Sequence, residues 1–186
     1  DWQALQPQHS PSPRYGAMMV EDPAGGVMLF GGTDLQNWFG DQWHWNGTDW
    51  QSVTPPNMPP ARAHMQAGYS PTQAVAVMFA GYTTSATYFD ETWLWNGQRW
   101  TQPSIAGTLP SPRLFHAMAF DSNRGVSVLF GGSNSFFGVR NNETWEFNGA
   151  AWSLRSTSGP SPRRGHAMAY DSSRHVIVLF GGFDGG

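Results

Sequence analysis

The sequence predicts an all-β protein, a single domain built from about four similar units. The first observation is a repeat, because Arg-x-x-His-Ala-Met-Ala-(Phe/Tyr)-Asp occurs at Arg113 and Arg163 and looser copies occur at Arg14 and Arg62. These arginines lie 48, 51 and 50 residues apart, and a fixed period of that size marks a repeat architecture. The second is composition, with 12% charged residues, 15% aromatic residues, 22 Gly and 14 Pro. Such a composition suits short strands joined by tight turns.

The unit that begins at Arg113 shows the first two expected strands. Residues 116–120 alternate large and small side chains, a period of two that is typical of a strand, and they end at a turn-rich stretch over 121–125. Residues 126–130 are almost continuously apolar ahead of Gly131-Gly132, as in a strand covered on both faces. We therefore expect two strands joined by a short turn.

Two further strands follow in the same unit. After a loop over 133–141, residues 143–147 and a strand around Trp152 flank Asn148-Gly149, the strongest two-residue hairpin signal. The hairpin recurs earlier as Trp43-His44-Trp45-Asn46-Gly47, closed by Trp50, and as Trp93-Leu94-Trp95-Asn96-Gly97, closed by Trp100. Four strands per unit is the arrangement of a propeller blade.

Side-chain size predicts how the blades are arranged. Blades converge on an axis, so the strand with the smallest side chains is expected to be innermost, and that is the first strand of each unit. The aromatic residues of the third and fourth strands are expected to fill the space between diverging blades. The small residues of the first strands are Ala67, Gly68, Ala117, Ala119, Ala167 and Ala169.

The chain resembles the kelch-repeat family along essentially its whole length. The features that carry the resemblance are the Gly-Gly doublets at 31–32, 131–132 and 181–182, with one Trp on the expected third strand and another on the fourth. The second unit departs from the pattern with Ala80-Gly81. The resemblance implies a β-propeller that binds a partner or ligand and leaves that partner open.

The units do not complete a ring by themselves. We expect one domain over 1–186, with complete units at 11–52, 59–102 and 110–154, only a fourth strand in 1–10 and only the first two strands in 160–186. Trp2 supports this division, since it precedes Arg14 by the 12 residues that separate Trp50 from Arg62. Three alternatives remain: a four-bladed ring with one thin blade, a fragment of a six- or seven-bladed ring, or a half-ring that pairs with a second copy. Open blade edges favour association, so we expect a homo-oligomer, in the simplest case a dimer.

Several function classes are disfavoured by composition. The net charge is −3 without a basic stripe, which argues against nucleic-acid binding. No cysteine or lysine occurs, which excludes thiolate metal sites and Schiff-base chemistry. No apolar run approaches the ~20 residues of a membrane span, so we expect a soluble chain, processed or trimmed at Asp1, with no membrane contact, no cofactor and no metal.

Function is expected on the edge that carries the long loops. Arg14, Arg62, Arg113 and Arg163 open the units on that edge and could ring the mouth as a trap for carboxylate or phosphate. The favoured alternative is a series of structural ion pairs with carboxylates of the same edge. These carboxylates are Asp41, Glu91 and Glu143.

The three long loops each carry an adjacent aromatic pair, in the ranges 33–40, 82–89 and 133–141. The pairs are Trp38-Phe39, Tyr88-Phe89 and Phe136-Phe137, and Arg140 of the third loop joins them as a candidate binding residue. Their similar places favour packing over recognition, although one ring of a pair can point inward and the other outward. His116 and His166 share a register position with Ala17 and Met65, so we interpret them as packed strand residues rather than metal ligands.

We therefore expect a non-catalytic binding module for a peptide, protein or glycan. The alternative is a secreted, sialidase-like carbohydrate-active enzyme whose arginines bind an anionic sugar, although no catalytic constellation is visible. Sequons at Asn46 and Asn142 and the habit of the family suggest secretion.

Overall fold

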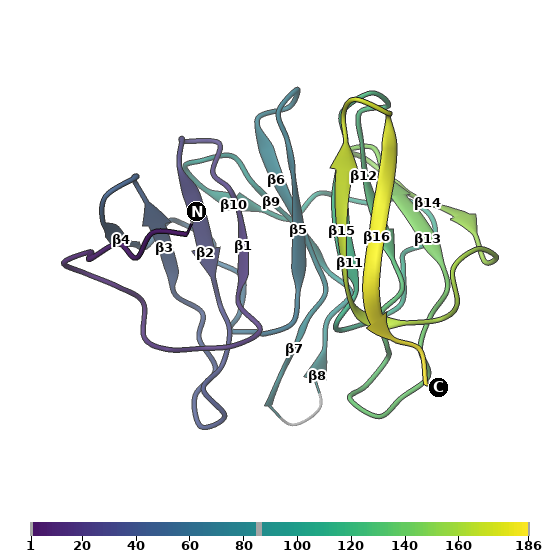
Figure 1. Ribbon diagram of the computed structural model, residues 1–186, viewed down its shortest axis with the longest axis horizontal. Coiled ribbons are helices and arrows are strands. Elements are labelled where there is room, and N and C mark those ends of the chain that lie inside the picture. The colour runs from purple at the N-terminus through teal and green to yellow at the C-terminus, as the bar shows by residue number, and fades with distance from the viewer. Residues whose placement is uncertain (1, 85–86, 186) are drawn as a thin grey trace.

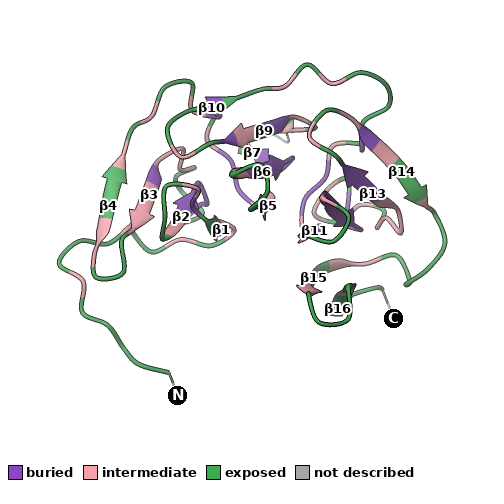
Figure 2. Ribbon diagram, turned by 90° about the horizontal axis from the view of Figure 1, so that it is seen from above, coloured by how far each residue is buried: buried purple, intermediate pink, exposed green. Residues whose placement is uncertain are grey.

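The computed structural model describes residues 2–84 and 87–185 and places antiparallel sheets side by side along an arc (Figures 1 and 2). The first unit holds β1 (Met18–Glu21), β2 (Val27–Phe30), β3 (Gln42–Trp45) and β4 (Trp50–Val53). The second holds β5 (Gln66–Ser70), β6 (Val75–Phe79), β9 (Thr92–Trp95) and β10 (Trp100–Thr101), and its long loop contains the short pair β7 (Tyr82–Thr83) and β8 (Thr87–Tyr88). The third holds β11 (Ala117–Asp121), β12 (Val126–Phe130), β13 (Thr144–Phe147) and β14 (Trp152–Ser156), and the fourth holds β15 (Arg164–Asp171) and β16 (Val176–Phe183).

Each of the first three units is a four-stranded meander in which the second strand pairs with both the first and the third. This confirms the predicted all-β blades of a partial propeller. The first strands β1, β5, β11 and β15 lie next to one another along the inside of the arc, as the small residues predict (Figure 2).

The core lies between consecutive blades and is filled by third- and fourth-strand aromatics, as predicted. Trp93, Trp95 and Trp100 of the second unit pack over Met28 and Phe30 of the first. In the same way Trp145, Phe147 and Trp152 of the third unit pack over Val77 and Phe79 of the second. Each blade therefore stabilises the face of the blade before it.

The arc is open at both ends, and the fourth strand expected in residues 1–10 is not formed. Residues 2–14 pair with no strand, and Trp2 is fully exposed at 104%. The physical reason is that Trp2 has no third strand beside it to pair with among the described residues. At the other end β16 pairs with β15 alone, and Figure 2 shows the first and last units facing each other across a gap.

Two residues with positive φ follow the second strand in the first three units and lie near the end of β16 in the fourth. The first of the two has φ of 71°, 62°, 67° and 72° at Gly31, Ala80, Gly131 and Gly181. The second has φ of 100°, 93°, 88° and 88° at Gly32, Gly81, Gly132 and Gly182. Ala is tolerated at the first position because φ near +60° is the left-handed region that L residues can enter, whereas the second position requires glycine.

Candidate functional site

The unit-opening arginines are structural clamps inside the blades. Arg62 Nη2 lies 2.6 Å from Glu91 Oε2, and Arg113 Nη2 lies 2.6 Å from Glu143 Oε2. Both arginine side chains are 0% exposed. Arg14 Nη1 lies 2.5 Å from Asp41 Oδ1. The ion-pair alternative therefore describes the first three units, and a ring of arginines around the mouth is not formed there.

Each carboxylate is held from a second side. The indole Nε1 of Trp93 donates to Glu91 at 2.9 Å and that of Trp145 donates to Glu143 at 3.0 Å. Burial alone would raise the pKa of Glu91 and Glu143, but the hydrogen bonds from the arginine and tryptophan outweigh burial and leave both pKa values below the ordinary 4.5. The pairs therefore stay ionised at neutral pH.

Arg163 keeps the same pose without an acidic residue from a third strand among the described residues. It donates to the carbonyl oxygens of Ser161 and Gly181 and to Ser161 Oγ. This arginine is partly exposed, unlike Arg62 and Arg113. The Ser161 hydroxyl also donates to Asp184 Oδ2 at 3.2 Å, which places a carboxylate near this arginine.

In each of the first two loops the two rings of the aromatic pair point in different directions, one into the blade and the other toward the axis. Phe39 lies under the guanidinium of Arg14 at 4.0 Å, and Phe89 lies under Arg62 at 3.8 Å. Their neighbours Trp38 and Tyr88 pack against Tyr82. Residues 85 and 86 of the second loop lie outside the described residues.

The third loop does not follow this register, which corrects the expectation of equivalent pairs. Phe39 and Phe89 each donate a backbone hydrogen bond to the second glycine of the doublet, at Gly32 and Gly81, and in the third unit this donor is Asn141. The equivalents of the first two pairs are therefore Arg140 and Asn141. The longer loop carries Phe136 inward and leaves Phe137 98% exposed, while Arg140 lies over Phe183 at 5.0 Å.

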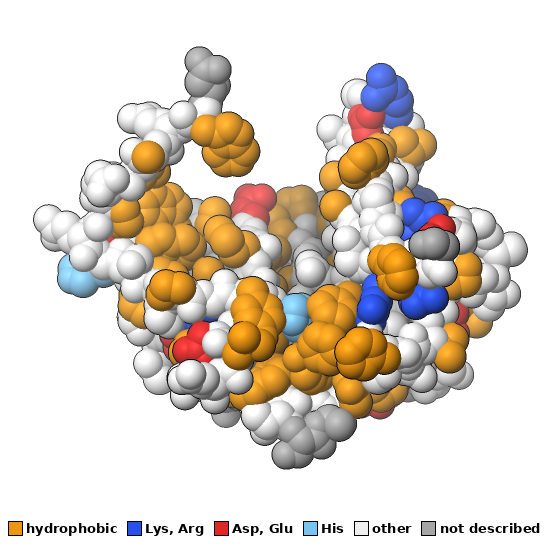
Figure 3. Space-filling view, turned by 60° about the horizontal axis from the view of Figure 1, so that its bottom comes forward, with side chains coloured by type: hydrophobic (Ala, Val, Ile, Leu, Met, Phe, Trp, Pro, Cys, Tyr) orange, Lys and Arg blue, Asp and Glu red, His pale blue; other side chains and the backbone are white. Residues whose placement is uncertain are grey.

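An aromatic cup, defined by Tyr15, His64, Tyr82, Phe115 and Phe136, occupies the inner end of the long-loop edge. His64 lies at the centre, with its ring 4.2 Å from Phe115 and stacked on Tyr82 at 5.7 Å. Phe136 closes the cup over Tyr82 at 4.8 Å and Phe115 at 5.2 Å. Figure 3 shows hydrophobic side chains gathered over this face.

Two cup residues hold a backbone conformation that is unusual for large side chains. His64 and Phe115 have φ of 57° and 58°, and the equivalent positions in the outer units are glycines, Gly16 and Gly165. Backbone hydrogen bonds run from unit to unit through these positions, from His64 N to Gly16 O (2.7 Å) and from Gly165 N to Phe115 O (2.8 Å). Bulky residues persist in this region where the surroundings over-determine them, often at binding sites.

The cup is uncharged at neutral pH. Burial lowers the pKa of His64 to about 4 and raises the pKa of Tyr82 to about 12. The buried Nε2 of His64 has no hydrogen-bond partner among the described residues. The cup therefore offers apolar ring surface with a neutral imidazole at its centre.

An open pocket of about 540 Å³ adjoins the cup between the third and fourth units. Phe115 and Phe136 are shared with the cup, and Phe137, Arg164 and Phe183 form the remaining wall. Leu35 and Val139 on neighbouring loops are 80% and 73% exposed. The long-loop edge thus combines a rigid aromatic centre with exposed apolar loop tips, as interaction surfaces do.

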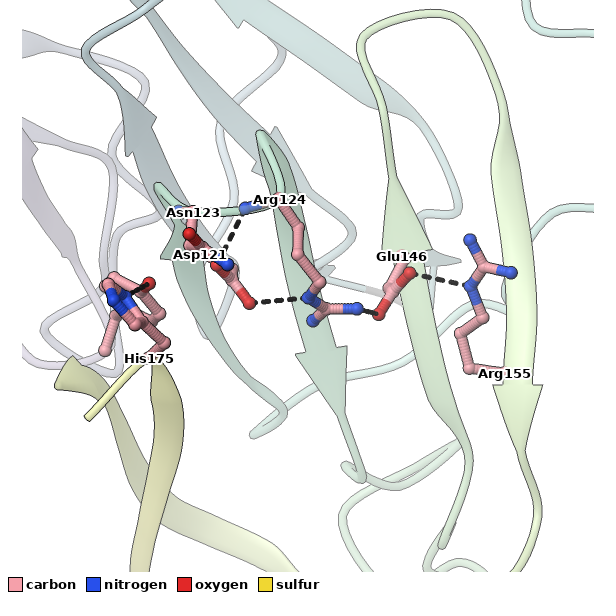
Figure 4. Close-up of polar contacts among 7 residues, drawn as sticks. Asp121, Asn123, Arg124, Glu146, Arg155 and His175 are labelled. Atoms are coloured by element: carbon pink, nitrogen blue, oxygen red, sulfur yellow. Dashed lines mark hydrogen bonds and ion pairs between the residues drawn. The ribbon is translucent and has the colours of Figure 1, made fainter. Parts of the chain in front are cut away.

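The opposite edge holds a structural polar network (Figure 4). Arg124 contacts both Asp121 and Glu146, and Arg155 Nε donates to Glu146 at 2.6 Å. Two carboxylates and two guanidiniums balance in charge, so the network ties the β11–β12 turn to β13 and β14. His116 and His166 are buried against Phe79 and Phe130, as packed residues.

No group of three or more His, Asp or Glu side chains that could hold a metal ion occurs in the described part of the chain. Over the same residues no helix is long and apolar enough to cross a membrane. Sequence reasoning identified Phe136 but missed Tyr15, His64, Tyr82 and Phe115. The signal for two of them was present, since the second position after the opening arginine is Gly in the outer units and His64 or Phe115 in the middle ones.

Residues 44–186 match the family model of the KLHDC2/KLHL20/DRC7 Kelch-repeats domain. The matched segment begins in β3 and includes every later strand. No curated protein matches the chain.

Proposed function

The chain belongs to the kelch-repeat family, whose domains are typically protein-binding β-propeller modules, and from that membership we propose that it binds a protein ligand, without catalysis, through the aromatic cup. The observation that carries the proposal is the cup itself, in which His64 and Phe115 hold φ near +57° where the outer units have glycine. Rigid aromatic groups of this kind anchor protein ligands at low entropic cost. The exposed loop tips beside the cup would form the rim.

The outer units supply the variants that test this. His64→Gly and Phe115→Gly each remove one ring. The equivalent positions in the outer units are Gly16 and Gly165, which also have positive φ, so the backbone is expected to keep its conformation. The probe is a peptide selected from a random displayed library on the immobilised chain. We expect each variant to bind the selected peptide at least tenfold more weakly, a loss of about 1.4 kcal/mol in binding free energy. Arg155→Gln, on the opposite edge, is the control that retains binding.

Two results would overturn the assignment. One is a selection that yields no peptide above background, and the other is binding that the cup variants leave intact while Arg155→Gln removes it. Circular dichroism of each variant is the check that the fold is retained, and with a retained fold a loss of binding reports on the rings themselves.

We also infer that the chain associates with a second copy through its two open ends. Val178 and Phe180 occupy the place of Val77 and Phe79, which the next blade covers, but they are 50% and 83% exposed. At the other end Met19 is 58% exposed beside Trp45 and Trp50. This is the face that covers the preceding blade in the later units, where it is formed by Met118, Phe147 and Trp152.

The two ends are thus complementary in the way that consecutive blades are. Light scattering after size exclusion is expected to give a mass near twice 20.5 kDa. Phe180→Asp should give a monomer, whereas Phe137→Asp, at an even more exposed phenylalanine on the loop edge, should leave the dimer. A monomeric parent chain at high concentration would overturn the association and leave the cup proposal standing.

A further inference from the structure

The junction between the first two blades contains a pocket of about 370 Å³. Both of its walls come from complete units, with Gln42 and His44 of β3 on one side and Trp95 of β9 on the other. The turn after β9 also packs on the turn after β1, since a Cβ on Gly97 would lie 3.0 Å from Ala24 N. The pocket therefore does not depend on either open end of the arc.

Asp22 holds the polar groups of this pocket in place. Its Oδ1 accepts from Trp95 Nε1 at 2.9 Å, a hydrogen bond that joins the two blades, and from the backbone N–H of Ala24 at 3.0 Å. His44 Nδ1 lies 3.0 Å from Asp22 Oδ2. Because a carboxylate only accepts, Nδ1 carries the proton and Nε2 is the acceptor of the neutral ring. The side chain of His44 is 20% exposed, so a molecule in the pocket can reach it.

Gln42 supplies a buried donor without a partner. Its Oε1 accepts from Trp100 Nε1 at 2.7 Å, which orients the amide and leaves Nε2 as the donor. This Nε2 is buried and has no hydrogen-bond partner among the described residues. Buried polar groups are nearly always hydrogen-bonded. A free amide donor in the wall of a pocket therefore points to a bound molecule.

The junction between the second and third blades is built differently at the same places. Leu94 stands at the position of His44 and packs with Ile105 against the apolar core. Thr92 stands at the position of Gln42 and also accepts from an indole of the next blade, at 2.9 Å, but it offers no amide. The polar lining is thus a property of the first junction and not a requirement of blade packing.

We propose that this pocket binds a neutral hexose unit. Gln42 and His44 are two residues apart on β3, so they share a face about 6.6 Å apart along the strand, and one offers a donor while the other offers an acceptor. A hydroxyl group both donates and accepts, and a sugar ring carries several of them, far enough apart to reach both side chains.

The remaining lining fits the same ligand. Val53 and Pro55 add apolar surface for the C–H groups of the ring. The described lining residues include no arginine, so no bidentate partner for a carboxylate is present, and the buried Asp22 would repel one. This site is separate from the aromatic cup and goes beyond the proposed function.

The probes are the methyl glycosides of glucose, galactose and mannose, titrated into the isotope-labelled chain and followed by NMR. At least one should give saturable shifts of the Trp95 indole N–H and the Gln42 side-chain amide, and leave the resonances of Tyr82 and Phe136 unchanged. The uronic acid of the best-binding sugar, which adds only a carboxylate, should bind at least tenfold more weakly. Tighter binding of a disaccharide that ends in this sugar would assign the pocket to the end of a glycan, and equal or weaker binding to a free sugar.

The second junction supplies the variants. His44→Leu and Gln42→Thr introduce the residues found at Leu94 and Thr92, and the threonine keeps an acceptor for Trp100. We expect each variant to bind the best-binding glycoside at least tenfold more weakly. The shifts on the parent chain test the site independently of how the variants fold.

His175→Asn, at an exposed turn of the fourth unit, is the control that keeps the affinity. A panel that gives no saturable shift would overturn the proposal and would mean that water alone satisfies Gln42. Unchanged affinity in both junction variants, equal affinity for the uronic acid, or shifts confined to the cup would also overturn it. Peptide binding by the cup is a separate measurement that none of these results changes.

Discussion

At the scale of single residues, arginine does what lysine could not. Arg113 uses three nitrogen atoms in fixed directions to hold two backbone carbonyls, a hydroxyl and a carboxylate. A lysine ammonium, as a point charge on a flexible stem, would not satisfy all of them. Ten arginines and no lysine in the chain are consistent with this demand for fork geometry. The cost of burying the guanidinium is offset because each of its three nitrogen atoms has a hydrogen-bond partner.

The buried histidines predict how stability depends on pH. In the folded chain burial lowers the pKa of His64 and His166 to about 4, against an ordinary value of 6.5. Between these values the unfolded chain binds more protons than the folded chain, so stability decreases as pH falls from 6.5 toward 4. The slope is at most about 1.4 kcal/mol per pH unit for each histidine. Urea unfolding followed by tryptophan fluorescence at several pH values measures it.

Carboxylates add to the same trend at lower pH. The pKa values of Glu91 and Glu143 lie below 4.5 in the folded chain, so their contribution to stability is present above the unfolded pKa and is lost as pH falls through the folded pKa.

The control for the histidine prediction is His166→Met, since Met65 occupies this position in the second unit. It should reduce the slope between pH 6.5 and 4. An unchanged slope would mean that His166 is not protonated preferentially on unfolding.

At the scale of the strand and its turn, the two glycines of the doublet differ in why they disfavour a side chain, since one has only a strained backbone and the other also has a steric clash. In the fourth unit a Cβ on Gly181 would meet no atom within 4 Å, whereas a Cβ on Gly182 would lie 2.8 Å from His166 Cβ and 3.0 Å from Arg164 O. Both residues have positive φ, 72° and 88°. A side chain at the first position therefore has only the cost of a positive φ, whereas a side chain at the second position has that cost and a steric clash.

We expect Gly181→Ala to lower the free energy of unfolding by about 1 kcal/mol and Gly182→Ala by about 2–4 kcal/mol. The two variants are adjacent and differ only in what the new methyl group meets. Thermal or urea unfolding of both, side by side, is the measurement. Equal losses would show that φ alone decides the cost at this turn.

The same scale shows what could be read from sequence. The second strand of the third unit was predicted at 126–130 and β12 spans those residues, because apolar β-branched runs bounded by Asp and Gly specify a buried strand locally. The loop pairs were predicted in one register, but the third loop is longer and its equivalents are Arg140 and Asn141. The centre of the cup was missed because His64 reaches its neighbours through contacts between units that no local pattern encodes.

At the scale of the whole molecule, buried indoles join the first blade to the second and the second blade to the third. Trp100 Nε1 donates to Gln42 Oε1 at 2.7 Å, and Trp152 Nε1 donates to Thr92 Oγ1 at 2.9 Å. Both bonds cross between units within the apolar core. Stability of such an array approximates a sum of unit and interface contributions, so these bonds govern whether the blades unfold together.

Thr92→Val tests this coupling, because valine keeps the shape and leaves the buried Trp152 Nε1 without an acceptor. The expected loss is about 1–3 kcal/mol. Since the lost bond joins the second and third units, the urea transition should also broaden, with a smaller m value. Thr101→Val, on the exposed side of β10, is the control with neither effect. A loss of stability at constant m would mean that the blades still unfold as one.

The one-sided pairing of β16 also determines how fast its amide protons exchange with deuterium. In β12 each edge of the strand is bonded, so exchange of its amides waits for the opening of the blade. In β16 the outward amides, including that of Gly181, have no strand partner among the described residues and should exchange without opening of the sheet, while those that face β15 are protected. Deuterium uptake along this strand should therefore alternate from residue to residue between Val176 and Phe183.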